Sequence, residues 1–125
     1  MSNFKQYHLT ATKFNKHSID FQCETEMPEF NANVVKIEKF QGFSKATGCK
    51  YYFRVKNQSS WANSKQITGL WRTPRPGVYS GDIKSQSGKT LILFKIHNDW
   101  QNLTLYLFPN GFNPVWQIGS IVETL

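Results

Sequence analysis

Two apolar runs separated by a short polar segment constrain the fold of this chain more than any other feature. Residues 91–96 read LILFKI and residues 103–108 read LTLYLF, with HNDWQN between them. On an extended chain both runs are apolar on nearly both faces, which is typical of strands in the middle of a sheet covered on both sides. The connection, of about four to six residues, lies in the usual range for a hairpin. We therefore expect a central β-hairpin over residues 91–108.

Alternation of apolar and polar side chains with a period of two extends through the rest of the chain. The cleanest case is CKYYFRVKN at residues 49–57, where Tyr51, Phe53 and Val55 are expected to point inward. The proline after Met27 ends an earlier run, because proline has no N–H to donate to a strand ladder. Further strands are expected at residues 4–12, 18–25, 34–40, 65–71 and 78–83, with loops at 42–48, 72–77 and 84–89, a tight Asn-Gly turn at 109–112 and a last edge strand at 119–125.

A sheet that is apolar on both faces needs a second sheet or helices to cover it. No long stretch has a helical period, and only residues 12–17 and 112–118 leave room for a helical turn or two. The predicted fold is therefore mainly β, an antiparallel β-sandwich or a small barrel. The alternative is an α+β fold, in which one or two short helices cover an antiparallel sheet. The length of 125 residues predicts a single domain over residues 1–125.

The N-terminal sequence and the cysteines indicate the compartment. The first residues lack the apolar segment of a secretory signal, and no run of about eighteen apolar residues would span a bilayer. Cys23 and Cys49 form no CxxC motif and are not accompanied by clustered histidines, so neither a zinc site nor any other cofactor is expected. We expect a cytoplasmic protein with reduced cysteines, and leave open whether the two cysteines lie near each other.

Positive charge is concentrated in the middle of the chain. The net charge is +7, and residues 36–95 carry twelve Lys and Arg side chains against only Glu38 and Asp82, a local net charge of +10. Charge of this asymmetry is informative about partners, and it indicates a polyanion or a protein with an acidic surface. The alternative explanation is that the lysines keep an aromatic-rich domain soluble.

The outward face of the strand at residues 49–57 is the first candidate binding surface. Lys50, Tyr52, Arg54 and Lys56 alternate with the inward residues, and outward residues of a strand are about 7 Å apart. Cations at that spacing can follow a phosphate backbone, and Tyr52 can stack on a base. The alternative is a strand whose outer face is simply hydrated, with Tyr52 present for its β propensity.

The segment GLWRTPRPG at residues 69–77 is the second candidate. Its prolines stiffen a loop that carries Arg72 and Arg75, and arginine pairs phosphate or carboxylate with two hydrogen bonds. Trp71 beside them can stack on a ligand. The alternative is a tryptophan that anchors the core, followed by an ordinary proline-rich loop.

The polar segment HNDWQN carries the only group that invites a catalytic interpretation. His97 and Asp99 are two residues apart, so an extended chain would place them on one face. Asn98 and Asp99 also cap turns, and Trp100 can fold over the end of the hairpin, which explains every residue without chemistry. The sequence therefore favours a turn. The acidic group Glu24, Glu26 and Glu29 is likewise explained by a solvated strand face.

Three classes of function follow from these patterns. The first is a small, basic, non-catalytic protein that binds RNA or single-stranded DNA. The second is a protein inhibitor or interaction module, such as a phage-type anti-defence (anti-CRISPR-like) protein that blocks a nucleic-acid-processing enzyme. The third is a small metal-independent endoribonuclease that uses His97, Arg72, Arg75 and Tyr79. No HExxH, GxSxG or P-loop motif occurs, so the chain is not expected to be an enzyme, and the expected partner is nucleic acid or a nucleic-acid-processing protein, not a membrane.

Overall fold

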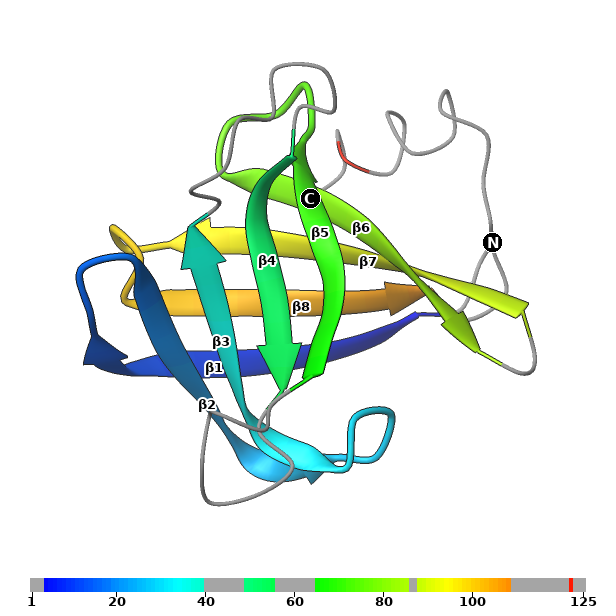
Figure 1. Cartoon of the computed structure of the whole chain (residues 1–125), viewed down its shortest axis with the longest axis horizontal. Coiled ribbons are helices and arrows are strands. Elements are labelled where there is room, and N and C mark those ends of the chain that lie inside the picture. Colours follow the sequence, from blue (N-terminus) through cyan, green and yellow to red (C-terminus); the bar gives the residue numbers. More distant parts are fainter. Residues whose placement is uncertain (1–3, 40–48, 56–64, 86–87, 109–121, 123–125) are drawn as a thin grey trace.

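Eight antiparallel strands form a closed barrel in the computed structural model, which describes residues 4–39, 49–55, 65–85, 88–108 and 122 (Figure 1). Each strand pairs with the next in the chain, and β1 pairs with β8 to close the barrel. The strands are β1 (Lys5–Phe14), β2 (Ser18–Met27), β3 (Ala32–Lys39), β4 (Cys49–Val55), β5 (Lys65–Arg72), β6 (Val78–Ser85), β7 (Gly88–His97) and β8 (Asn102–Phe108). The prediction of a mainly β fold is confirmed, in its barrel form.

Side chains fill the interior of the barrel, as expected for eight strands. The alternation predicted for residues 49–57 is confirmed over residues 50–55, because Phe53 and Val55 are buried in the core and Tyr51 packs against it. The Phe53 ring contacts Phe94 at 5.0 Å and Phe30 at 5.2 Å between centroids, in edge-to-face geometry. The described core side chains thus pack against one another in the middle of the barrel.

The hairpin of β7 and β8 is buried on both faces, as its sequence predicts. Leu105 points into the barrel interior, whereas Leu93 belongs to a second apolar cluster, and neither side chain is exposed. Phe4 packs on the same cluster, at 5.3 Å from the ring of Phe108. The members of this outer cluster are Val78, Leu91, Leu93, Tyr106, Phe108 and Val122.

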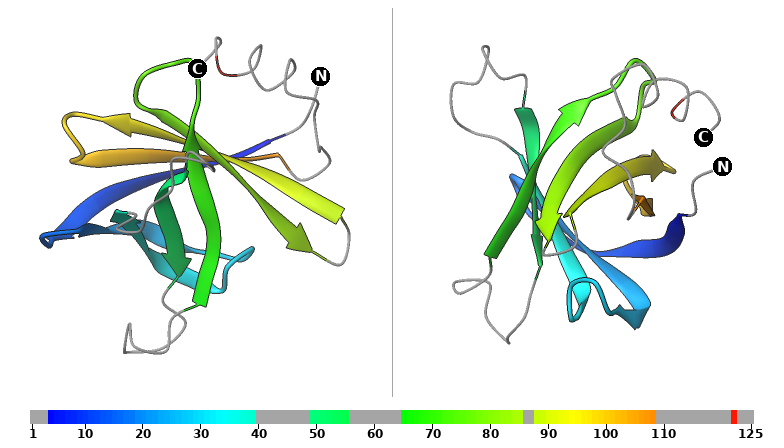
Figure 2. Two further views of the ribbon diagram at one scale, coloured as in Figure 1. Left: turned by 45° about the horizontal axis from the view of Figure 1, so that its top comes forward. Right: turned by 90° about the vertical axis from the view of Figure 1, so that its right-hand side faces the viewer.

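The pairing between β5 and β6 is shorter than that between any other neighbouring strands of the barrel. They share two residue pairs, Trp71 with Ser80 and Arg72 with Tyr79, and beyond these the strands diverge (Figure 2). A Cβ atom built on Gly81 would lie 2.5 Å from the carbonyl oxygen of Gly69. Glycine at position 81 thus lets the two backbones approach where they cross.

Expectations for two short connecting segments can be compared with the structure. Residues 12–17, which leave room for a helical turn, form none: β1 continues to Phe14, and an irregularity in pairing falls between Ala11 and Lys13. The loop predicted at 84–89 is shorter, since strand pairing extends to Ser85 and Gly88. The predictions for residues 42–48, 109–112, 112–118 and 119–125 lie outside the described residues, apart from Val122. No helix in the described part of the chain is long and apolar enough to cross a membrane.

The two ends of the barrel differ. At one end the turn between β2 and β3 buries Met27 and Phe30 against the core, and the Tyr7 hydroxyl donates to the Glu29 carboxylate at 2.5 Å. Burial and this hydrogen bond raise the pKa of Tyr7 to about 12. The opposite end gathers the β1–β2 turn, the end of β3, the start of β4, the β5–β6 loop and the β7–β8 turn. We call this second end the open end, because it carries the cavity described next.

Candidate binding site at the open end of the barrel

Trp100 is held over the open end by an unusual turn. Asn98, Asp99 and Trp100 have consecutive positive φ angles of 51°, 52° and 68°. Asn and Asp tolerate this left-handed conformation, but a large side chain rarely adopts it. The turn is fixed by hydrogen bonds from the Gln101 N–H to the Asn98 carbonyl (3.1 Å) and from the Ala11 N–H to the Gln101 carbonyl (2.9 Å). The prediction that HNDWQN forms a turn is confirmed.

Two tyrosine rings, from β4 and β6, contact the Trp100 ring of this turn. The Tyr51 ring lies 5.3 Å from Trp100 and 5.1 Å from Tyr79, and Tyr79 lies 6.3 Å from Trp100, between centroids. Burial, followed by the charge of Tyr79 and a hydrogen bond with it, raises the pKa of Tyr51 to about 12, although the positive charge of Arg72 acts in the opposite direction. Tyr51 therefore stays protonated at neutral pH, and Arg72 lies close enough to affect it.

A cavity of about 320 Å³ opens beside these rings. Trp100 and Tyr51 form one side of it, and Ile19 and Ile37 supply aliphatic surface. Phe14, at the end of β1, lies at its margin and is 53% exposed. The full lining comprises Phe14, Asn15, Lys16, His17, Ser18, Ile19, Ile37, Lys39, Tyr51 and Trp100.

The rim of this cavity is cationic. Lys16 lies in the β1–β2 turn and Lys39 ends β3, where its N–H donates to the His17 carbonyl at 2.7 Å. Neither lysine forms an ion pair with a residue that the structure describes, and no described lining residue is acidic. Asp99, exposed in the neighbouring turn, is a carboxylate at this end of the barrel. The arrangement combines aromatic surface with uncompensated positive charge.

The β5–β6 loop, at the same end of the barrel, lines a second concavity of about 340 Å³. The Thr73 hydroxyl donates to the Val78 carbonyl at 2.8 Å, and Gly77 has a φ of 80°, so the loop is well fixed. Arg72 is exposed there. Arg75 donates from Nη1 to the Val122 carbonyl at 3.2 Å.

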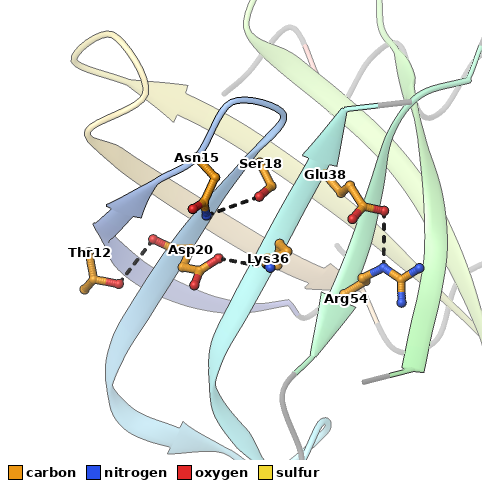
Figure 3. A network of polar contacts seen from close by, with 7 residues as sticks. All are labelled: Thr12, Asn15, Ser18, Asp20, Lys36, Glu38 and Arg54. Atoms are coloured by element: carbon orange, nitrogen blue, oxygen red, sulfur yellow. Dashed lines mark hydrogen bonds and ion pairs between the residues drawn. The ribbon is translucent and has the colours of Figure 1, made fainter. Parts of the chain in front are cut away.

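The predicted stripe on β4 lies on the outer face of the barrel, but part of its charge is compensated. The Arg54 Nε lies 3.3 Å from Glu38 Oε1, and the neighbouring Lys36 Nζ lies 3.8 Å from Asp20 Oδ1 (Figure 3). Lys50 is exposed and Tyr52 is half-buried on the same face, while Lys56 lies outside the described residues. The described part of this face is therefore an alternating network of charges.

Figure 3 also shows how the network on β2 and β3 continues toward the open end. The Thr12 hydroxyl donates to the Asp20 carbonyl at 3.4 Å, and the Asn15 amide donates to the Ser18 hydroxyl at 3.3 Å. These contacts fix the β1–β2 turn that carries Lys16 and His17. The outer-face network thus supports the position of one wall of the cavity.

The candidate residues Trp71, Arg72 and Tyr79 do not all lie on one surface. Trp71 is half-buried and pairs in the sheet with Cys49 and Ser80, so it lies on a different face from the inward residue Leu70. Arg72 and Tyr79 both line the β5–β6 concavity. The prediction that Trp71 stacks on a ligand stays a prediction.

His97 is not among the lining residues of either cavity. Its Nε2 lies 2.9 Å from the Thr104 hydroxyl, which also lies 3.4 Å from Nδ1 of His8 on β1. Burial, with the positive charge of Lys95 and the charge of His8, lowers the pKa of His97. The endoribonuclease hypothesis requires His97 beside Arg72, Arg75 and Tyr79, whereas the structure gives His97 partners on the outer face of β8.

Metal ligation has no support among the described residues, since no three His, Cys, Asp or Glu side chains cluster there. Cys23 is a buried free cysteine in the core. The side chain of Cys49 lies outside the described part of the structure, so its distance from Cys23 stays open.

Sequence reasoning missed the two lysines and the phenylalanine at the cavity. Lys16, Lys39 and Phe14 stand at strand ends, where alternation carries no signal. The signal that was available is topological, because in a sheet of consecutive antiparallel strands every second connection lies at the same end. Residues 15–17, 73–77 and 98–101 occupy such alternate connections.

No protein-family model matches the chain, and the comparisons with curated proteins and with solved structures found no match either. The geometry of the open end is therefore the basis for assigning a function.

Proposed function

We propose that this protein binds single-stranded nucleic acid at the open end of its barrel, without catalysis. The observation that carries the proposal is the convergence of the Tyr51 and Trp100 rings with Lys16 and Lys39 around one cavity. Proteins that bind single strands combine cations that track the phosphates with aromatic rings on which bases stack. Both elements are present at this end.

The distribution of charge supports the open end over the outer face of β3 and β4. Lys36 and Arg54 each have a carboxylate within ion-pair distance, so their charges are already compensated. Lys16, Lys39 and Arg72 have no such partner in the described part of the chain. A phosphate gains more from a cation that no carboxylate neutralises, because it does not have to displace an existing partner.

Charge reversal at two places tests the proposal. In Lys39→Glu and Arg72→Glu, affinity for a short single-stranded oligonucleotide should fall by roughly tenfold or more, because each variant replaces attraction by repulsion. Lys5→Glu changes the net charge equally but lies at the opposite end of the barrel, where Lys5 is 3.4 Å from Glu29. This control should lose less than about threefold.

Salt dependence and partner identity complete the test. Affinity should decrease steeply between about 50 and 200 mM salt, since binding releases counterions. Binding that is insensitive to salt, or equal losses in Lys39→Glu and Lys5→Glu, would overturn the proposal. Capture of a host protein that survives nuclease treatment, without any oligonucleotide binding, would favour the interaction-module alternative instead.

A further inference from the structure

We infer that the cavity at the open end holds one unstacked nucleobase of the bound strand, with the adjoining phosphate at Lys16 and Lys39. This inference rests on the proposed function, since it names the part of the nucleic acid that occupies the site. It adds a specific contact that electrostatic attraction to a strand does not require.

The dimensions of the cavity fit a small occupant. Its volume of about 320 Å³ is at the lower end of the range of ligand pockets, which is roughly 300–1,000 Å³. Below Tyr51 and Trp100 the barrel interior is filled by side chains that are each about 1% exposed, namely Leu70, Phe94 and Leu103. An occupant therefore enters from the open end and stops at the rings, which suits a single planar ring system with its sugar outside.

The walls of the cavity match the chemistry of a base. Phe14, Tyr51 and Trp100 offer aromatic surface, and stacking on such rings tolerates every base because each has a π-face. Phe14 is the more exposed of the two large apolar side chains that are exposed in the described chain, and a stacked base would cover it. The polar groups of Asn15 and Ser18 supply donors and acceptors within the same lining.

The charge around the cavity indicates that the occupant carries a phosphate. Lys16 and Lys39 stand in the lining, and no described lining residue is acidic. An aliphatic carboxylate would meet the same cations and the same apolar surface. It would not stack, however, and the collection of three rings at one cavity is what favours a nucleobase over an acyl chain.

The test compares probes that share phosphates but differ in bases. The probes are a short single-stranded oligonucleotide, the same backbone with abasic sites throughout, a 5′-mononucleotide, and oleate as the acyl alternative. Wild-type protein should bind the intact oligonucleotide roughly tenfold or more tightly than the abasic backbone. The mononucleotide should compete for the same site, and oleate should not.

Two variants and a matched control locate the contact. Trp100→Asn removes the ring but keeps a residue that tolerates positive φ, so the turn is retained. Phe14→Ser removes an exposed ring at the margin of the cavity and leaves the core intact. Both should shrink the difference between intact and abasic probes to less than about threefold. Phe4→Ser removes a similarly exposed phenylalanine, 48% exposed, on the outer cluster and should leave the difference unchanged.

The outcomes separate the two proposals. Equal, salt-dependent binding of intact and abasic probes would overturn the nucleobase site and leave the proposed function standing. Binding of the mononucleotide alone would support the nucleobase site and contradict the binding of strands. Competition by oleate, or a difference between probes that persists in both Trp100→Asn and Phe14→Ser, would overturn the nucleobase site. Failure of every nucleic-acid probe to bind would overturn both.

Discussion

At Gly81 the backbone packing leaves no room for a Cβ atom. Gly81 lies where β5 and β6 cross, and a Cβ atom there would stand 2.5 Å from the Gly69 carbonyl oxygen and 3.1 Å from a Thr68 methyl carbon. The nearest obstacle is backbone, which cannot rotate away as a side chain would. The strands must therefore separate to accept any other residue.

Gly81→Ala should lower the free energy of unfolding by about 1–3 kcal/mol, because the added methyl group overpacks the crossing of β5 and β6. Urea denaturation followed by circular dichroism measures the change. Ser80→Ala, at the adjacent position, should stay within about 0.5 kcal/mol of wild type. A Gly81→Ala variant as stable as Ser80→Ala would contradict the close approach.

The raised pKa of Tyr51 leads us to expect that the folded protein loses stability at high pH. The pKa of Tyr51 is raised to about 12 in the folded protein, above the ordinary value of 10.0. Between these values the unfolded chain loses a proton that the folded chain keeps, so stability is intact below pH 10 and decreases as pH rises toward 12. Thermal unfolding measured across this range should show a steeper decrease for wild type than for Tyr51→Phe. Identical pH profiles would mean that the Tyr51 hydroxyl is not shielded from solvent.

The residues around the cavity show why a site is harder to predict than a strand. Trp100 follows two residues that favour turns, so a turn could be predicted, but three consecutive left-handed residues could not. Arg54 was predicted to be outward and is, yet its contact with Glu38 depends on the pairing of β3 with β4. Local alternation predicts which face of the sheet a side chain lies on. Which side chain of the adjacent strand it contacts depends on the register of the two strands.

At the scale of elements, the hairpin of β7 and β8 is the part that sequence describes best. Both runs of its sequence are apolar on two faces, and the structure buries Ile92 inside the barrel and Leu93 in the outer cluster. What covers the second face could not be predicted, because the cover includes Val122 from a distant part of the chain. The pairing of β1 with β8, which distinguishes a closed barrel from a sandwich, is equally non-local.

Leu93→Ala should cost about 2–5 kcal/mol of unfolding free energy, the amount expected for a fully buried leucine. Leu105→Ala, on the inner face of the same hairpin, provides the matched comparison. Chemical denaturation of the two variants should give similar losses. A cost below about 1 kcal/mol for Leu93→Ala alone would show that the outer face of the hairpin is open to solvent.

At the scale of the whole molecule, the described residues at the two ends of the barrel differ. At one end Met27 and Phe30 are buried and Tyr7 contacts Glu29. The other end carries a cavity with an aromatic side and a cationic rim. Among the seven described Lys and Arg side chains of residues 36–95, Lys36 and Arg54 lie within ion-pair distance of carboxylates, and Arg75 donates to the Val122 carbonyl. The open end is where uncompensated charge coincides with exposed rings.

Chemical-shift mapping with a single-stranded oligonucleotide tests this location most directly. On titration of isotope-labelled protein, the account predicts that the largest amide perturbations fall in the β1–β2 turn, at Lys39 and in the β7–β8 turn around Trp100. Perturbations centred on the outer face of β3 and β4, around Lys36 and Arg54, or spread evenly over the barrel, would contradict it.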